Sequence, residues 1–133
     1  MTTTHKIAHK ILREPQEVVT VYRVGVWAVH ESDEVTISDL SRPNAEARVV
    51  TGYVLTHTPS GLSASAFHSL DDATAAADML GAAHGDWAQD APFGDADAPY
   101  WAQHADVSRD IRVALAAAKM TRLAARHAAK VQP

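Results

Sequence analysis

The sequence predicts an α+β fold, in which an antiparallel sheet of three to four strands carries two C-terminal helices on one face. Segments rich in Val, Tyr and Trp come first, and turn residues separate them. Alanine-rich segments with helical periodicity come last. A length of 133 residues fits one domain. We therefore expect a polar N-terminal segment at 1–16 and a single domain at 17–133.

The N-terminal segment has a weak helical pattern. Ile7, Ile11 and Leu12 recur at helical spacing, which allows a short helix that ends before Pro15. His5 and His9 have the i, i+4 spacing that can place two imidazoles on one metal ion. No acidic third ligand lies near them, so the sequence favours a polar tail over a metal site.

Strand signals fill the next part of the chain. Residues 17–30 are apolar on both faces and predict a central strand, in which Gly25 marks a bulge or a close backbone approach. The sequence ESDE at 31–34 is expected to turn the chain into a short second strand with Val35 and Ile37.

A second hairpin is predicted after the connection SRPNAEA. Residues 47–57 and 62–68 form its strands, and TPSG forms its turn because proline and glycine suit the turn positions. This register places His57 opposite Leu62. The small residues of the return strand leave room for a helix on the sheet.

A capped helix follows this hairpin directly. Ser69 can cap it, and Asp72 stands three residues later as in a capping box. Either Gly81 or Gly85 is expected to end the helix. Its apolar face is predicted to contain Leu70, Ala73, Ala77 and Leu80.

A loop at 85–105 and a helix at 107–130 complete the chain. The loop is longer than most connections, and such loops are often functional. The helix is predicted to separate its residues into two stripes. The apolar stripe is Val113, Ala117, Met120, Ala124 and Val131, and the basic stripe is Arg112, Lys119, Arg122, Arg126 and Lys130.

Composition excludes several classes of function. The chain has no cysteine, which rules out disulfide scaffolds, cysteine-ligated zinc and thiol catalysis. No apolar run is long enough to span a membrane, and the first residues lack the apolar core of a secretory signal. We expect a cytoplasmic protein without a cofactor. Asp95 and Asp97 alternate as calcium ligands do, but the rest of an EF-hand loop is missing, so we expect no metal.

The charges are segregated along the chain, although the net charge is only −4. Residues 71–97 contain aspartates and no Lys or Arg, whereas residues 105–133 are mainly basic. The acidic segment continues into an aromatic loop, whose aromatic side chains supply contact area while its aspartates attract a basic partner.

We therefore expect a small non-enzymatic binding protein that contacts a basic protein surface. One concrete form is a phage- or plasmid-type inhibitor of nucleic-acid-handling machinery, whose carboxylates imitate phosphates and occupy a basic groove. The expected contact residues are Asp86, Trp87, Asp90, Phe93, Asp95, Asp97, Tyr100 and Trp101.

Several alternatives stay open. The basic stripe could follow a nucleic-acid backbone, although no aromatic, Asn or Gln side chain is interleaved to read bases. A His-dependent enzyme could use His57 or His84, for which the sequence places no nucleophile nearby. The acidic segment could instead close onto its own last helix, and the alanine face of that helix could form a homodimer.

Overall fold

The computed structural model of the protein describes residues 2–8, 14–38, 47–94 and 105–131. The chain is α+β, and its described residues form two antiparallel sheets and two helices. A ribbon, β1–β2, precedes a four-stranded sheet of order β3-β4-β5-β6. The elements are β1 (Thr4–Ala8), β2 (Pro15–Val19), β3 (Tyr22–Val24), β4 (Trp27–Ser38), β5 (Ala47–His57), β6 (Leu62–Phe67), α1 (Leu70–His84) and α2 (Ala105–Val131).

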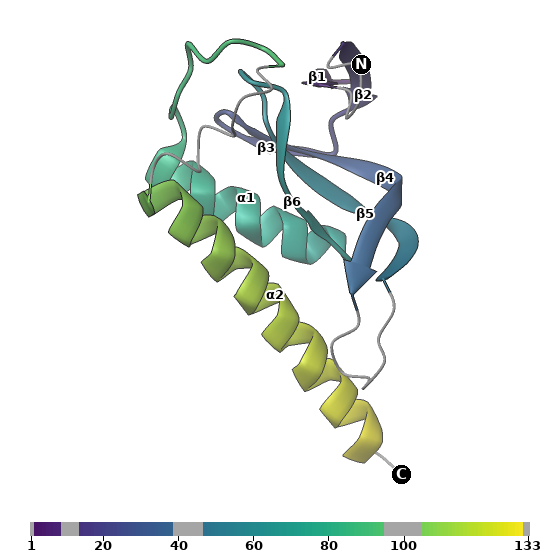
Figure 1. Ribbon diagram of the computed structural model, residues 1–133. Coiled ribbons are helices and arrows are strands. Elements are labelled where there is room, and N and C mark those ends of the chain that lie inside the picture. The colour runs from purple at the N-terminus through teal and green to yellow at the C-terminus, as the bar shows by residue number, and fades with distance from the viewer. Residues whose placement is uncertain (1, 9–13, 39–46, 95–104, 132–133) are drawn as a thin grey trace.

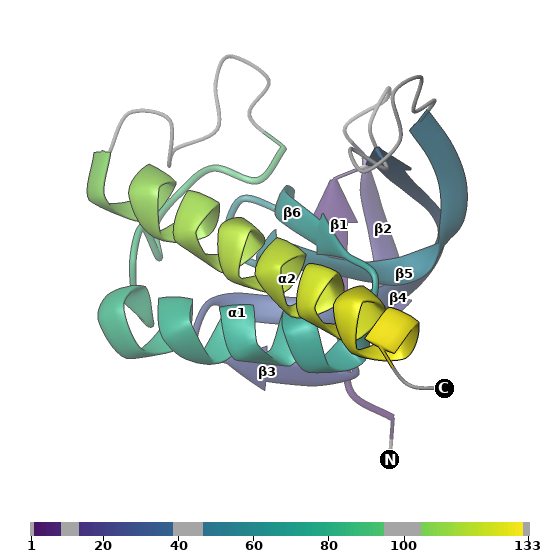
Figure 2. The same ribbon diagram turned by 90° about the horizontal axis from the view of Figure 1, so that it is seen from below.

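The helices and the ribbon lie on opposite sides of the four-stranded sheet (Figure 1). Helix α1 contacts all four strands, and α2 packs against α1 and β6 (Figure 2). The ribbon contacts β4 and β6 from the other side. The core therefore forms between the sheet and the helices. It includes Trp27, Val29, Leu55, Phe67, Ala73, Ala76, Ala77, Leu80, Val107, Ile111, Ala114 and Ala118.

Residues Thr4–Ala8 form strand β1, so the short helix expected for the N-terminal segment is wrong for these residues, whereas Ile11 and Leu12 lie outside the described residues. His5 pairs with Val18 and Lys6 with Glu17 in the antiparallel ribbon. Buried His5 and exposed Lys6 follow the period of two that a strand imposes. The threonines and Ile7 favour extended backbone, and pairing with β2 decides the conformation. The boundary expected at residue 16 falls inside β2.

The first reversal of the four-stranded sheet occurs at Gly25 and not at ESDE. Gly25 has φ 58°, a left-handed conformation that glycine adopts without steric cost. A Cβ atom there would also collide with the carbonyl oxygen of Gly85. Strand β4 then continues through ESDE without reversing, and its pairing with β5 has a register shift between Ser32 and Val35. The polar run is therefore an irregular part of a long strand, and the predicted turn at 31–34 was wrong.

The second hairpin and the start of α1 follow the prediction. β5 spans Ala47–His57, and His57 pairs with Leu62. The Ser69 hydroxyl accepts a hydrogen bond of 3.1 Å from the Asp72 amide, as a helix cap does. The helix continues past Gly81 to His84. Leu70 is exposed and does not belong to the packed face.

Helix α2 packs through a different face from the predicted one. Among the α2 side chains that the structure describes, the buried ones are Val107, Ile111, Ala114 and Ala118. Four residues of the expected apolar stripe are exposed instead, namely Val113, Ala117, Met120 and Ala124. The side chain of Val131, the fifth, is not among those that the structure describes. The C-terminal part of α2 extends beyond α1 (Figure 1). Over the described residues, neither helix is long and apolar enough to cross a membrane.

Candidate functional site

Three aromatic rings connect the end of α1 to the sheet. Trp87 follows α1 and stacks on Trp27 of β4, with 6.3 Å between ring centroids and 4° between ring planes. The His57 imidazole of β5 lies 5.3 Å from the Trp27 ring and 5.2 Å from the Trp87 ring. The indole nitrogen of Trp27 also donates a hydrogen bond of 3.0 Å to the His84 carbonyl oxygen. This cluster holds the residues after α1 against the sheet.

His57 is a fully buried, neutral part of this cluster. Burial lowers its pKa, against a smaller raising effect of the hydrogen bond to Trp87. Its Nε2 lies 2.8 Å from the Trp87 carbonyl oxygen, and its Nδ1 lies 2.8 Å from the Ser60 hydroxyl. Because a carbonyl only accepts, Nε2 carries the proton and Nδ1 accepts from Ser60. His57 and Ser60 are both fully buried, so a substrate does not reach this Ser–His pair in the described conformation.

The turn that follows α1 spans residues 85–94, is called the acidic turn below, and is held at both ends. At its start, Trp87 is packed inward. Further along, the Gly94 amide donates a 2.8 Å hydrogen bond to the Ser60 carbonyl oxygen, and the Phe93 ring lies against Gly61. Between these points, Ala88 has φ 52°, a left-handed conformation that is costly for a residue other than glycine. The turn is thus an ordered segment that contains a strained residue.

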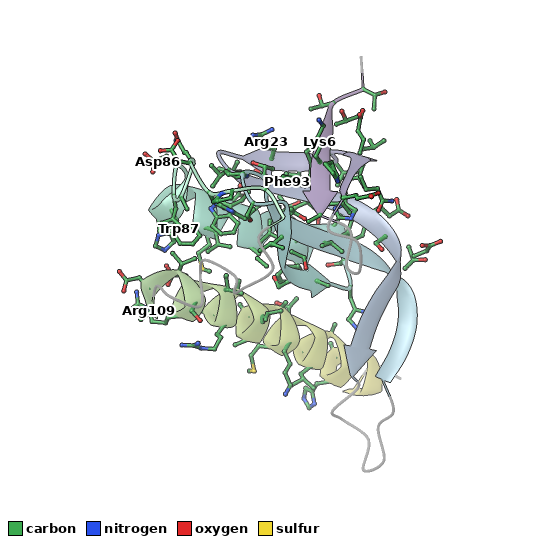
Figure 3. All side chains as sticks on the ribbon, turned by 45° about the horizontal axis from the view of Figure 1, so that its top comes forward. Lys6, Arg23, Asp86, Trp87, Phe93 and Arg109 are labelled. Atoms are coloured by element: carbon green, nitrogen blue, oxygen red, sulfur yellow. The ribbon has the colours of Figure 1, made fainter. Side chains whose placement is uncertain are left out.

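The acidic turn surrounds an open depression of about 510 Å³. Asp86 and Asp90 are exposed and belong to its lining. Figure 3 shows Asp86 at the outer edge of the molecule. The complete lining is Asp86, Ala88, Gln89, Asp90, Ala91 and Pro92. The depression is therefore acidic, and its described side chains include no base.

A second polar contact joins the two helices beside this turn. His84 Nε2 lies 2.8 Å from Asp110 Oδ2, and Arg109 Nε lies 3.5 Å from Asp110 Oδ1. The hydrogen bond from His84 is the main cause that lowers the pKa of Asp110. The pair therefore connects the last turn of α1 to the first turns of α2.

The basic residues of α2 are separate from the acidic turn. Arg109, Arg112 and Lys119 are exposed, and Arg112 donates a 3.0 Å hydrogen bond to Ser108. Among the side chains that the structure describes, no ion pair connects the aspartates of residues 71–94 with α2. The expected closure onto the last helix is thus not formed by these side chains. Arg122, Arg126 and Lys130 lie on α2, but their side chains are outside the described part.

The structure places half of the expected contact residues. Asp86 and Asp90 are brought together on one turn, Trp87 points inward, and Phe93 packs beside the β5–β6 turn. Asp95, Asp97, Tyr100 and Trp101 lie outside the described residues. Sequence reasoning missed Asp110 as the partner of His84. A separation of 26 residues carries no periodic signal, and only the approach of α2 to α1 creates the contact.

Comparison with known proteins gave no match, whether to a protein-family model, to a curated protein or to a solved structure. Within the described part of the chain, no three His, Asp or Glu side chains gather in a way that could hold a metal ion. The arrangement of this chain's own residues is therefore the basis for a functional proposal.

Proposed function

We propose that the protein is a small non-enzymatic binding protein, and that its acidic turn contacts a basic surface on a protein partner. The observation that carries this proposal is the pair Asp86 and Asp90, two exposed carboxylates at one depression. Neither carboxylate has a basic partner among the described side chains. Such a pair attracts cationic side chains, and none of the described ones neutralises it.

The rigidity of the turn supports the same proposal. Trp87 stacks on Trp27, and its carbonyl oxygen accepts a hydrogen bond from buried His57. These contacts fix the backbone between Asp86 and Asp90 before a partner arrives. A preformed site loses less conformational entropy on binding than a flexible one does. Trp87 therefore acts as an internal support, and the carboxylates act as the contact groups.

An inhibitor of nucleic-acid-handling machinery, of the phage or plasmid type, is the specific form that we favour. Its partner would have a basic groove that normally holds phosphates, and the carboxylates would occupy that groove. Mimicry of this kind predicts binding that weakens as salt rises, because screening acts on exposed charges.

Affinity capture from native cell lysate, followed by titration of the purified partner, tests the proposal. Asp86→Asn with Asp90→Asn removes the two charges and keeps the side-chain shape. We expect this variant to lose the partner, with an affinity at least about tenfold weaker at low salt. The matched control is Glu31→Gln with Asp33→Asn, which removes two exposed charges from β4. Equal binding by both double variants would show that the acidic turn is not the partner-binding site.

Nucleic-acid binding by α2 is the second candidate. Exposed Arg109, Arg112 and Lys119 of α2 favour it, because exposed cations on one helix can neutralise phosphates. A gel shift at low salt separates the two candidates. Arg112→Ala with Lys119→Ala should abolish a shift that depends on α2, whereas the Asp86 and Asp90 variant should leave that shift intact.

A further inference from the structure

Two buried histidines join the N-terminal ribbon to the four-stranded sheet. His5 of β1 and His30 of β4 are each only 6% exposed. Their rings meet edge to face, with 5.5 Å between centroids and 62° between planes. His5 Nδ1 also lies 2.6 Å from the Thr20 hydroxyl, just after β2. This contact lies on the side of the sheet away from both helices.

Both rings are held in the neutral form. Within the described structure, His5 Nε2 and His30 Nδ1 are buried without a hydrogen-bond partner. Burial lowers the pKa of His5 to about 4, with smaller contributions from His30 and Arg23. Burial also lowers the pKa of His30. A proton on either ring would have to be accommodated without an acceptor and beside a second imidazole.

The charged groups around the pair do not offset such a proton. Arg23 of β3 adds positive potential at His5. Lys6 and Glu17 are paired with each other in the ribbon register and are exposed. Glu31 adjoins His30 along β4 and is exposed, and its side chain points to the opposite face of the sheet because successive strand residues alternate. The titratable His57 of β5 packs against Trp27 on the helix side, and β6 carries no charged residue.

We propose that His5 and His30 form an acid-sensitive latch, whose protonation releases the β1–β2 ribbon from the sheet while the helix-covered core stays folded. The release follows mainly from burial, since a proton on either ring is a charge held away from water, and a second proton would add a like charge at the ring contact. It goes beyond partner binding by the acidic turn, which lies on a different part of the molecule, and it does not depend on that function.

The connectivity of the ribbon suits this movement. β1 pairs with β2 and with no other strand in the described structure. One backbone hydrogen bond, 2.8 Å from the Ala8 amide to the Gly61 carbonyl oxygen, joins β1 to the β5–β6 turn. The ribbon can therefore separate as a unit. Its departure would expose Ala28 and Thr56, which are buried on the same side as His30.

The pH range in which the ribbon opens follows from the number of protons that the closed and open states bind. Each ring binds protons more readily when the ribbon is open, with an ordinary pKa near 6.5. Closure is thus complete above about pH 6.5 and weakens as the pH falls toward 4. From the pKa of His5 alone, the opening equilibrium at pH 5 should be about 30-fold larger than at pH 8.

Hydrogen exchange of the full-length protein, corrected for the intrinsic rate at each pH, tests the latch. Between pH 8 and pH 5, protection of the ribbon amides, including Ala8, should fall about 30-fold. Protection of α1 amides such as Ala77, which exchange through global unfolding, should stay larger than that of the ribbon at both values of pH. His5→Phe with His30→Phe keeps two rings that do not titrate and should remove the fall in ribbon protection. His127→Gln, on an exposed part of α2, should retain it.

Three results would overturn the latch. One is equal ribbon protection at both values of pH in the natural sequence. Another is equal protection of the ribbon and of α1 at each pH, which would indicate that the ribbon opens only in global unfolding. The third is an undiminished pH response in the double phenylalanine variant. The natural sequence alone decides the first two results, so the conclusion does not depend on the folding of a variant.

Discussion

At the scale of single residues, Gly81 shows how tertiary contact overrides helix propensity. Glycine inside a helix usually costs about 1 kcal/mol relative to alanine. In α1, however, a Cβ atom at this position would collide with Val24 Cγ1 and would lie 2.7 Å from Val24 Cβ. Gly81 therefore permits the close approach of α1 to β3.

We predict that Gly81→Ala destabilises the protein, although the same change in an open helix would stabilise it. The expected loss is about 1–3 kcal/mol of unfolding free energy, because backbone must shift to admit the methyl group. Urea denaturation measures the loss. Val24→Ala in the same chain should recover part of it, since the closest contact disappears while the Val24 Cβ contact remains. A gain in stability from Gly81→Ala alone would contradict this packing.

His57 and Ser60 show why residue type alone does not establish chemistry. A serine hydroxyl and an imidazole at 2.8 Å resemble the pair that activates a nucleophile. Here both groups are buried, and the second ring nitrogen is committed to the Trp87 carbonyl oxygen. The pair fixes the β5–β6 turn and the residues after α1, which in turn positions Asp86 and Asp90.

At the scale of elements, substitutions on two adjoining faces of α2 test which face is packed. Ala118 is buried, whereas Ala117 is exposed on the adjoining face. We predict that Ala118→Leu destabilises the protein by about 1–3 kcal/mol, because the added atoms overfill a close helix contact. The matched change Ala117→Leu should alter stability by less than about 0.5 kcal/mol. Thermal unfolding of both variants distinguishes the two faces, and the reverse order would support the stripe that the sequence predicts.

Elements with local signals could be predicted from the sequence. The turn residues TPSG predicted the β5–β6 hairpin, and Ser69 with Asp72 predicted the start of α1. The packed face of α2 could not be predicted in this way. Its candidate faces are mostly alanine, so the larger Val113 and Met120 dominated the pattern, although they are exposed. The packing of α2 on α1 and β6, which no local pattern encodes, buries Ala114 and Ala118 instead.

The acidic residues of the candidate site could be predicted from the sequence, but the contacts that support them could not. Charge counting identified the acidic segment that contains Asp86 and Asp90. The inward orientation of Trp87 depends on the stack with Trp27, which is 60 residues away in sequence. The ribbon that brings His5 to His30 depends on pairing with β2 and on contact with β4, so a weak local pattern gave the wrong element.

At the scale of the whole molecule, three buried histidines link stability to pH. Burial lowers the pKa values of His5, His30 and His57 below their ordinary value. The unfolded chain therefore binds more protons than the folded protein as the pH falls below about 6.5. The stabilisation is complete above that pH and declines toward pH 4. Asp110 acts in the same direction at lower pH, because its lowered pKa stabilises the folded protein above its ordinary value of 3.8 and this contribution is lost as the pH falls below that value.

We predict that the free energy of unfolding is nearly constant between pH 7 and 8.5 and falls as the pH is lowered to 5. His5 alone should account for about 2 kcal/mol of the loss at pH 5. Urea titrations followed by tryptophan fluorescence measure this, since Trp27 is buried in the core. His5→Phe with His30→Phe should reduce the pH dependence and leave a remainder from His57. Stability that is constant or increases toward pH 5 would show that these rings are not buried in the neutral form.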